Sequence, residues 1–399
     1  MSTFTKSAMQ RLAEVSGDFE AWWDSSPLIF KVWTKSMIAK APEKDRPELE
    51  KQLKVLFDYD NPASTLFCGV TTNPRLTRKV LDLIPEEVNP IIDKMIKDNP
   101  VKDNAKLAWK LYKAITEKGA QLYTPLFEKS KYTKGYVSAQ VDPRLVTDVK
   151  EMLWQALELQ KIAPNIMVKC PGSKEGIYLL QTLTTLGIPT NSTLVFNVPG
   201  AMQVAKAVKR GCEIGKVWGV DYSQWRSVIT IMIGRFEGRP QFAQSAESVG
   251  IEFTEELARW AGIAIAKKVH GLLNDPRNEY KSKLLLCSAR PGPGQGNVYH
   301  IEKVAGGNLV YTLNPEIIDD FMRICACKDI YSQINDAVPE DIMVKLLKIP
   351  YFVEGYEEDG IAIEDFVNHP SFVYTRDEFS GSMKEIEEYV EGRRKVVGR

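Results

Sequence analysis

One lysine near the end of an apolar run is the residue of this sequence best suited to covalent chemistry. Lys169 follows the apolar residues 166–168, and Asn165 and the Pro-Gly pair at 171–172 bound the run, which predicts a short strand buried on both faces. An ammonium group is costly to bury, so this lysine must reach solvent, pair with an anion or lose its proton. A neutral amine could attack a carbonyl and form a Schiff base, an electron sink for making or breaking the adjacent carbon–carbon bond. Taken alone, the strand favours the solvated alternative.

Polar side chains also occur near the ends of other apolar runs. Eight runs have the composition of strands, and helical patterns separate nearly all of them; the runs are 19–26, 66–74, 135–142, 165–172, 192–197, 226–233, 283–287 and 308–312. This alternation predicts an α/β fold, and eight strands within about 330 residues favour a (β/α)8 TIM barrel over a doubly wound sheet. The polar residues near the C-terminal ends of the strands are Asp24, Asn73, Gln140, Lys169, Thr193, Arg235, Ser288 and Arg290. In such a barrel these ends form one mouth, where active sites are found, so the set favours a chemical role for Lys169.

The helical patterns define the remaining organisation. They are expected at 1–17, 75–98, 105–130, 145–162, 173–186, 201–210, 252–272, 299–305 and 315–327, with a helix-rich segment at 29–57. We expect the barrel to occupy residues 1–338 and residues 339–399 to form a C-terminal helical extension packed on it. The extension contains an aromatic, acidic loop at 351–361 and a charged helix at 382–394. A lid over the mouth of the barrel is an alternative role for this extension.

The composition excludes several classes of protein. The chain has 399 residues, with 52 basic and 52 acidic side chains and 44% hydrophobic residues, which is typical of a globular protein and leaves no excess positive charge for nucleic acid. No apolar run approaches the roughly 18 residues of a membrane span, and residues 1–17 lack the apolar stretch of a signal peptide, so a cytoplasmic protein is expected. The six cysteines do not form a disulfide framework. Neither the Cys-x-Cys pair at 325–327 nor the three histidines has metal-ligand spacing, so buried thiols and no metal are expected.

Five motifs occur in an order that is typical of one enzyme family. They are Thr-Thr-Asn-Pro at 71–74, Ile-Met-Val-Lys at 166–169 with Glu-Gly at 175–176, Gly-Ile-Pro-Thr-Asn-Ser-Thr-Leu at 187–194, Ile-Gly-Arg at 233–235 and Ser-Ala-Arg at 288–290. These motifs resemble the second-strand, Schiff-base, fifth-strand and two phosphate-binding signatures of the transaldolase family. The similarity extends over residues 19–320. Four further stretches, at 22–25, 140–144, 231–235 and 356–360, resemble a less characterised group of long transaldolase-like proteins.

The resemblance implies a cofactor-free class I aldol enzyme. Lys169 would attack the carbonyl of a ketose, and Asp24 would handle the proton of the hydroxyl whose carbon–carbon bond breaks. Thr193 would position a catalytic water, although an ordinary β-branched strand residue is its alternative interpretation.

The same resemblance assigns the residues that bind substrate. Asn73 and Asn191 would hold the hydroxyls of the donor, with Thr72 in the same binding stretch as Asn73. A terminal phosphate would be held by a guanidinium fork and a hydroxyl, which suit a tetrahedral dianion; these residues are Arg235, Ser288 and Arg290. The structural alternatives are a turn cap for Asn73 and a loop ion pair for Arg290.

Two positions depart from the pattern of the family. Family members typically have a glutamate at the end of the third strand, whereas this chain has Gln140, which can orient a water but cannot exchange a proton. The fructose-6-phosphate aldolase branch also has glutamine there, but it has an acid–base tyrosine on the sixth strand, where this chain has Met232. Asp24 is our candidate for the missing role, and Asp58 and Asp60 compete with it because the insertion between the first two strands is long.

The resemblance therefore implies transfer of a three-carbon dihydroxyacetone unit between sugar phosphates, as in pentose phosphate metabolism, without metal or other cofactor. The alternatives are an aldolase that releases the ketone, an enzyme for a ketose sulfonate, and a catalytically silent barrel that binds a sugar phosphate. Lys169 argues against the silent barrel, because a binding protein needs no amine at that depth. Sugar phosphates are the expected partners, nucleic acid and membranes are not, and a homo-oligomer is left open.

Overall fold

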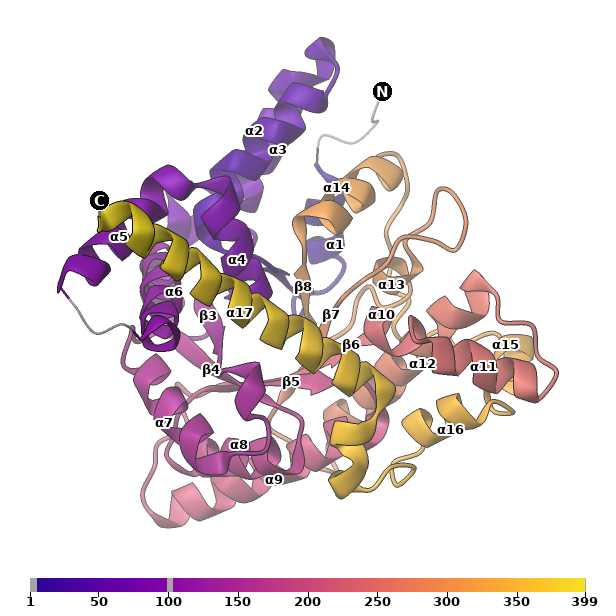
Figure 1. Ribbon diagram of the computed structural model, residues 1–399. Coiled ribbons are helices and arrows are strands. Elements are labelled where there is room, and N and C mark those ends of the chain that lie inside the picture. The colour runs from indigo at the N-terminus through magenta and orange to yellow at the C-terminus, as the bar shows by residue number, and fades with distance from the viewer. Residues whose placement is uncertain (1–5, 99–102, 399) are drawn as a thin grey trace. The chain divides into compact units, whose positions relative to one another are not determined.

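Eight parallel strands close into a barrel in sequence order. The computed structural model describes residues 6–98 and 103–398. The strands are β1 (Glu20–Trp23), β2 (Gly69–Thr71), β3 (Tyr136–Gln140), β4 (Ile166–Pro171), β5 (Thr190–Val195), β6 (Ser227–Met232), β7 (Lys283–Cys287) and β8 (Leu309–Leu313). Helices surround them, and the register pairs Gln140 with Lys169 and Met232 with Cys287 (Figure 1). The predicted (β/α)8 TIM barrel with C-terminal helices is thus confirmed.

The helices follow the strands in the expected alternation. They are α1 (Ala8–Glu14), α2 (Phe30–Lys40), α3 (Arg46–Leu56), α4 (Pro74–Leu83), α5 (Pro85–Asp98), α6 (Asn104–Lys129), α7 (Val149–Gln160), α8 (Lys174–Thr185), α9 (Val198–Val217), α10 (Ile233–Glu237), α11 (Pro240–Ser248), α12 (Glu255–Asn274), α13 (Tyr299–Glu302), α14 (Pro315–Ile324), α15 (Glu340–Leu346), α16 (Pro350–Tyr356) and α17 (Pro370–Val397). Short 3₁₀ turns are η1 (Pro27–Ile29), η2 (Glu43–Asp45), η3 (Pro62–Ser64), η4 (Pro143–Leu145) and η5 (Ile363–Asn368).

Several predicted helix boundaries were wrong. The single helix expected at 75–98 is two helices, because Pro85 lacks an amide hydrogen and its ring disfavours the helical conformation at Ile84, whose φ is −137°. The expected loop at 351–361 is partly the helix α16, and the charged helix expected at 382–394 begins much earlier, at Pro370. The helix α11 was not predicted.

The chain packs as two compact units. The first unit comprises Met1–Trp22 and Cys170–Thr375, and the second comprises Trp23–Lys169 and Arg376–Arg399. The division predicted between residues 338 and 339 coincides with none of the three boundaries between the units and stays a prediction.

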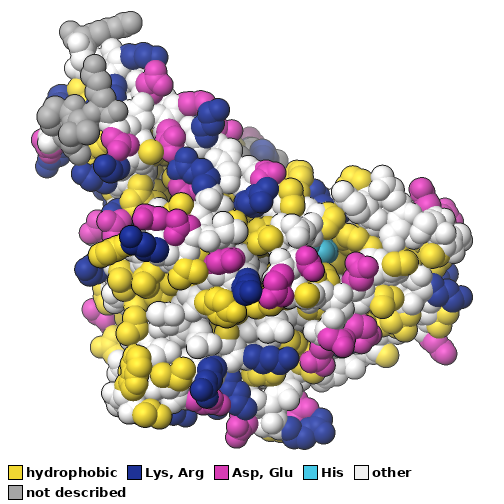
Figure 2. Space-filling model, turned by 60° about the horizontal axis from the view of Figure 1, so that its bottom comes forward, with side chains coloured by type: hydrophobic (Ala, Val, Ile, Leu, Met, Phe, Trp, Pro, Cys, Tyr) yellow, Lys and Arg dark blue, Asp and Glu magenta, His cyan; other side chains and the backbone are white. Residues whose placement is uncertain are grey.

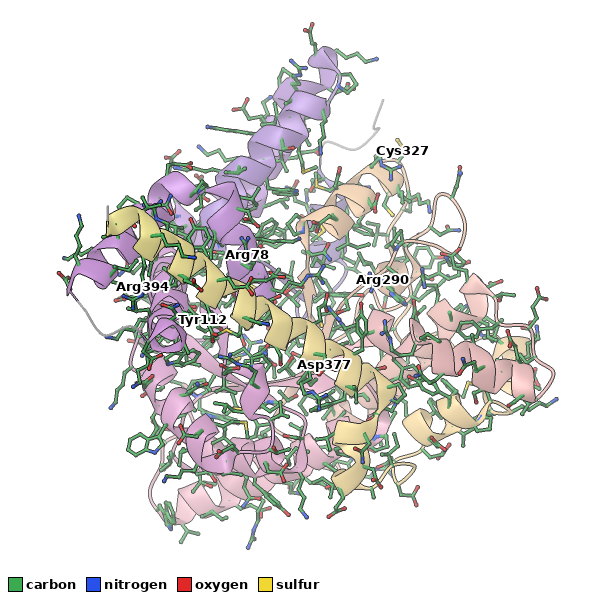
Figure 3. All side chains as sticks on the ribbon, viewed as in Figure 1. Arg78, Tyr112, Arg290, Cys327, Asp377 and Arg394 are labelled. Carbon is green, nitrogen blue, oxygen red and sulfur yellow. The ribbon has the colours of Figure 1, made fainter. Side chains whose placement is uncertain are left out.

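In the second unit, α17 lies across α4 and α5 (Figure 1). Arg393 forms an ion pair with Asp93 at 2.5 Å, and the hydroxyl of Tyr389 donates a hydrogen bond to Asn89 at 2.5 Å. Arg394, also on α17 and labelled in Figure 3, donates a hydrogen bond to the side chain of Asn104 on α6. Partly exposed ion pairs contribute little free energy, so burial of one apolar stripe holds this helix; its residues are Phe379, Met383, Ile386 and Val390.

The surface carries charges of both signs. Figure 2 shows basic and acidic side chains interspersed over one face, in keeping with the 52 residues of each kind. Within residues 6–98 and 103–398, no helix is long and apolar enough to cross a membrane. Cys327 is exposed (Figure 3), whereas the other five cysteines are buried, so the expectation of a buried thiol is wrong at this position.

In the first unit, a buried ion cluster ties together the N-terminal ends of three strands. Glu20 begins β1 and is only 9% exposed; its carboxylate accepts hydrogen bonds from Lys283 at 2.8 Å, from Arg226 and from the indole of Trp22. Burial alone would raise the pKa of Glu20, but the charges of Arg226 and Lys283 outweigh it and lower the pKa to about 2. Residues at this end of a TIM barrel serve stability, and we assign that role to the cluster.

Glu20→Gln should destabilise the protein in a way that depends on pH. A carboxyl whose pKa is lowered on folding stabilises the fold above its unfolded pKa of 4.5, and this contribution is lost as the pH falls through about 2. A shift of this size corresponds to about 3 kcal/mol at neutral pH. The variant should therefore unfold at lower urea concentration at pH 7, and its difference from the wild type should shrink below about pH 4.5.

Glu14→Gln is the control, because Glu14 pairs with Lys6 and both side chains are more than half exposed. Its free energy of unfolding should lie within about 0.5 kcal/mol of the wild-type value. A Glu20→Gln difference that stays constant from neutral to acid pH would contradict the assignment.

Candidate active site

In the second unit, the candidates lie at the C-terminal ends of β1 to β4. Asp24 directly follows β1, Thr72 and Asn73 directly follow β2, and Gln140 is the last residue of β3. Lys169 lies in the C-terminal half of β4 and is 3% exposed. Because the register pairs Gln140 with Lys169, the structure brings these two residues together on neighbouring strands.

Asp24 is held by its neighbour on β2. The hydroxyl of Thr71 donates a hydrogen bond to a carboxylate oxygen of Asp24 at 2.7 Å. The competing Asp58 and Asp60 instead form ion pairs with Lys54, at 3.7 and 3.0 Å, and the side chain of Asp60 is 84% exposed. Asp24 therefore has the strand-end position that an acid–base group needs, and its role stays a prediction.

The backbone of Gln140 is held by a buried tyrosine. Its backbone N–H donates to the hydroxyl of Tyr112 at 2.8 Å, and burial raises the pKa of that tyrosine above its ordinary value, so the phenol stays neutral. Gln140 itself is 2% exposed, and its side-chain oxygen has no hydrogen-bond partner among the residues that the structure describes. A buried amide oxygen of this kind readily accepts a hydrogen bond from a water or a substrate hydroxyl.

Asn73 has a structural role as well as a candidate one. Its side-chain oxygen accepts a hydrogen bond from the backbone N–H of Leu76 at 3.0 Å and so caps the N-terminus of α4. The amide nitrogen takes no part in the cap and is the atom that would donate to a substrate hydroxyl. The N–H of Thr72 donates to the carbonyl of Ser138 at 3.0 Å and prolongs the pairing of β2 with β3.

In the first unit, β5 contains an irregularity at its candidate residues. The pairing of β5 with β6 shifts register between Ser192 and Val195, and Leu194 has a φ of +55°, a conformation that side chains other than glycine rarely adopt. Thr193 is fully buried, and no hydrogen-bond partner of its hydroxyl occurs in the described part of the chain. Asn191 accepts a hydrogen bond from Thr230 on β6 at 2.7 Å. Strain and an unsatisfied hydroxyl are common features of functional sites.

The tips after β6 and β7 bring Arg235, Ser288 and Arg290 together. Ser288 has a φ of +60°, which is again a strained value for a residue with a side chain. Gly234 allows the tips to approach, because a Cβ there would contact the carbonyl oxygen of Ser288 and would lie 2.9 Å from Cγ of Arg290. Figure 3 shows the position of Arg290.

The electrostatics of these tips favour an anion. Partial desolvation lowers the pKa of Arg290, and the positive charges of Arg235, Arg259 and Arg239 lower it further, although Glu237 opposes them. A bound anion would offset this repulsion among guanidinium groups.

Several residues that position the candidates were not predicted. Thr71 could have been found, because it belongs to the Thr-Thr-Asn-Pro motif. Tyr112 and His300 contact the candidates only through tertiary structure, so the sequence gives no signal for them. The Cζ atom of Arg239 lies 3.7 Å from the ring centre of Tyr374. Arg239 follows Arg235 by four residues, and this spacing was the signal in the sequence for a second arginine near Arg235.

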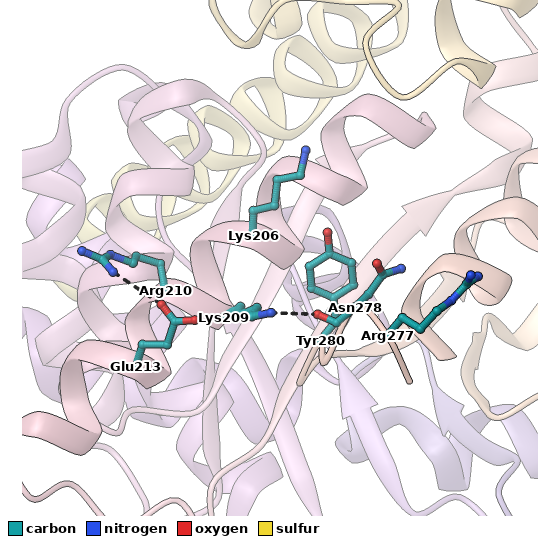
Figure 4. Close-up of a pocket in the computed structure, with 7 residues that line it drawn as sticks. All are labelled: Lys206, Lys209, Arg210, Glu213, Arg277, Asn278 and Tyr280. Carbon is teal, nitrogen blue, oxygen red and sulfur yellow. Dashed lines mark hydrogen bonds and ion pairs between the residues drawn. The ribbon is translucent and has the colours of Figure 1, made fainter. Parts of the chain in front are cut away.

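A second basic site in the same unit is a weaker candidate for anion binding. Figure 4 shows this hollow of about 380 Å³, lined by Lys206, Lys209, Arg210, Glu213, Arg277, Asn278 and Tyr280. Lys209 already donates to the carbonyl of Asn278, Arg210 pairs with Glu213, and Arg277 pairs with a neighbouring aspartate. No group of three or more metal-binding side chains was found in residues 6–98 and 103–398.

Comparisons with known proteins agree with the motifs. The family model described as Transaldolase/Fructose-6-phosphate aldolase matches residues 61–367. A protein named Transaldolase from Thiobacillus denitrificans is 29% identical over 265 residues, which cover 61% of this chain and 71% of that protein. Transaldolases from Helicobacter pylori and Mycobacterium bovis are 25% and 28% identical, over 64% and 63% of this chain and 73% and 70% of their own lengths. As its strand-end motifs predicted, the chain belongs to the transaldolase/fructose-6-phosphate aldolase family.

Proposed function

We propose that this protein transfers a three-carbon dihydroxyacetone unit between sugar phosphates through a Schiff base at Lys169. The observation that carries the proposal is the burial of Lys169 at the C-terminal end of a barrel strand, beside Gln140. The deprotonated amine of a lysine is its nucleophilic form. Membership of the family supports the same chemistry.

The reaction begins when the amine of Lys169 attacks the carbonyl of a ketose phosphate. Loss of water gives an iminium ion, which accepts the electron pair of the neighbouring carbon–carbon bond. Asp24 takes the proton of the hydroxyl on the β carbon as that bond breaks, and an aldose phosphate leaves. The enamine left on Lys169 attacks the aldehyde of a second aldose phosphate, Asp24 returns the proton, and water releases the product.

Water must be oriented for formation and hydrolysis of the iminium ion. Gln140 and Thr193 are our candidates for this role, because both are buried and both have a side-chain oxygen without a partner among the described residues. Neither side chain exchanges protons at neutral pH, so they orient the water and Asp24 moves the proton.

Binding of the substrate uses the remaining candidates. The amide groups of Asn73 and Asn191 and the hydroxyl of Thr72 hold the hydroxyls of the donor. The terminal phosphate is bound by Arg235, Ser288 and Arg290, whose mutual repulsion a dianion offsets.

An aldolase that releases free dihydroxyacetone is the second candidate function. Gln140 favours this function, because the aldolase branch that the chain resembles also has a glutamine at that position. The two functions differ in one product: an aldolase forms dihydroxyacetone from fructose 6-phosphate without an acceptor, whereas a transaldolase retains the unit until an aldose phosphate arrives.

Borohydride reduction in the presence of fructose 6-phosphate should attach a three-carbon unit to Lys169. Reduction converts the iminium ion into a stable amine, so mass analysis of peptides identifies the modified residue. Lys169→Ala should abolish the adduct. Lys174→Ala, at the first residue of α8, is the control and should retain it. The absence of an adduct with every ketose tried would refute the Schiff base.

Asp24→Asn should lower kcat by roughly 10²–10⁴ while the Schiff base still forms, because the amide cannot accept the proton. Asp60→Asn is the matched control, and its kcat should stay near the wild-type value because the side chain is largely exposed. The opposite pattern in the two variants would transfer the acid–base role to Asp60.

Arg290→Ala should weaken binding of phosphorylated substrates selectively. Loss of a charge-assisted contact should raise KM for fructose 6-phosphate by about 10- to 100-fold, with KM for unphosphorylated fructose changed less than about threefold. Arg277→Ala removes an arginine from the basic hollow of Figure 4 and should leave both constants unchanged. Equal effects of Arg290→Ala on the two substrates would argue against a phosphate contact.

A further inference from the structure

His300 and Glu237 form a buried pair beside Ser288–Arg290, the segment after β7 that we call the Arg290 tip. His300 is fully buried and Glu237 is 3% exposed. One ring nitrogen of His300, Nδ1, accepts a hydrogen bond from the backbone N–H of Arg290 at 3.0 Å. The other, Nε2, lies 3.0 Å from a carboxylate oxygen of Glu237. His300 therefore connects the backbone of one candidate phosphate residue to a buried carboxylate.

The two partners select one protonation form of the imidazole. A backbone N–H can only donate, so Nδ1 of His300 must carry no proton. The pKa of Glu237 is lowered, because the hydrogen bond from His300 and the charges of Arg259 and Arg290 act against burial, so the carboxylate is ionised and accepts the proton of Nε2. The neutral ring thus satisfies both neighbours at once.

Glu237 is also connected, through Arg259, to the residue that follows Arg290. Its second carboxylate oxygen forms an ion pair with Arg259 on α12, and Arg259 donates from Nε to the carbonyl of Pro291 at 2.9 Å. One carboxylate therefore anchors, through two side chains, the N–H of Arg290 and the carbonyl of Pro291. Glu237 belongs to α10, which also carries Arg235, so the anchor links both arginines of the candidate phosphate site.

The loop after β7 folds back to bring His300 to this position. Gly292 and Val298 form an isolated bridge that closes the loop, and His300 follows on α13. The hydroxyl of Tyr311 on β8 donates to the carbonyl of His300 at 2.9 Å. His300 is thus held by its own backbone as well as by its ring, as a side chain that positions another residue must be.

We propose that Glu237 and His300 are positioning residues that hold the backbone of Arg290 so that its guanidinium meets the phosphate of the substrate. They do not touch the substrate, and the proposal rests on the phosphate contact assigned above. A purely structural pair would affect stability and all substrates alike. A positioning pair affects substrates that carry the phosphate and leaves the reaction of bound substrate unchanged.

Two substitutions of His300 separate its two hydrogen bonds. His300→Asn offers an oxygen near the position of Nδ1 and can keep the bond to Arg290, although it cannot reach Glu237. His300→Gln extends to the position of Nε2 and keeps a donor for Glu237 but loses the bond to Arg290. His300→Gln should raise KM for fructose 6-phosphate and the Kd of inorganic phosphate by about 5- to 30-fold, and His300→Asn should raise them by less than about threefold.

The constants kcat and KM for unphosphorylated fructose should change less than about twofold in both variants. His270→Gln is the matched control, because His270 also accepts a backbone N–H, that of Asn308 at 3.1 Å, and the pair lies outside the Arg290 tip. It should leave the Kd of phosphate unchanged. If His300→Gln does not fold, Glu237→Gln tests the other arm of the anchor, because the amide loses the ion pair with Arg259, and it should raise the Kd of phosphate in the same range.

The inference is overturned if His300→Gln and Glu237→Gln leave the Kd of phosphate at the wild-type value, if fructose and fructose 6-phosphate are affected equally, or if the wild type binds no phosphate by calorimetry. Phosphate binding needs no turnover, so failure of the proposed function is a separate result. If the wild type forms no Schiff base, the aldol chemistry is refuted. If His300→Gln then still binds phosphate more weakly than the wild type does, the anchor is supported.

Discussion

Two hydrogen bonds from one buried amide fix the register on which the candidate site depends. Every residue of β4 is buried, so an alternation of apolar and polar faces cannot set its register. The amide nitrogen of Asn165, directly before β4, instead donates to the carbonyls of Ala120 and Gly135, both at 2.9 Å, and its own carbonyl accepts from Val137 at 2.9 Å. These bonds tie β4 to α6 and β3. A slip of one residue would move Lys169 to the opposite face of the strand, away from its position beside the mouth.

The sequence allowed the strands and their polar ends to be predicted, because strands buried on both faces appear as short apolar runs. Lys169 was recognisable for this reason: a charged residue interrupts a run that is otherwise apolar. Breaks within helical patterns were harder, as Pro85 shows, since proline is also tolerated in the first turn of a helix. The contact between His300 and Arg290 could not be predicted, because it depends on how the loop after β7 closes, and no periodic pattern encodes that closure.

The residues of the candidate site differ in whether they can exchange a proton. Neither Gln140 nor Met232 can exchange a proton, so the chain has neither the glutamate on the third strand nor the tyrosine on the sixth strand that the resemblance led us to expect. Both residues are buried. Thr71 nevertheless holds Asp24 in a fixed orientation. A hydrogen bond from a hydroxyl fixes the orientation of a carboxylate without removing its charge. The proposed mechanism therefore needs one oriented carboxylate to serve both directions of the transfer, with Gln140 limited to orienting water.

Charge explains why the proposed phosphate site of Arg235, Ser288 and Arg290 would need an anchor. Arg235, Arg239 and Arg259 all lower the pKa of Arg290, which means that these guanidinium groups repel one another. Repulsion among flexible side chains would spread them apart in the absence of substrate, and gathering them again would cost binding free energy. Glu237 opposes this by neutralising Arg259 and by holding the Arg290 backbone through His300. The remaining positive charge is then gathered before the substrate arrives, and a dianion, which attracts each guanidinium about twice as strongly as a monoanion, gains the most from it. On this argument, the proposed site should bind a phosphate more tightly than a sulfonate.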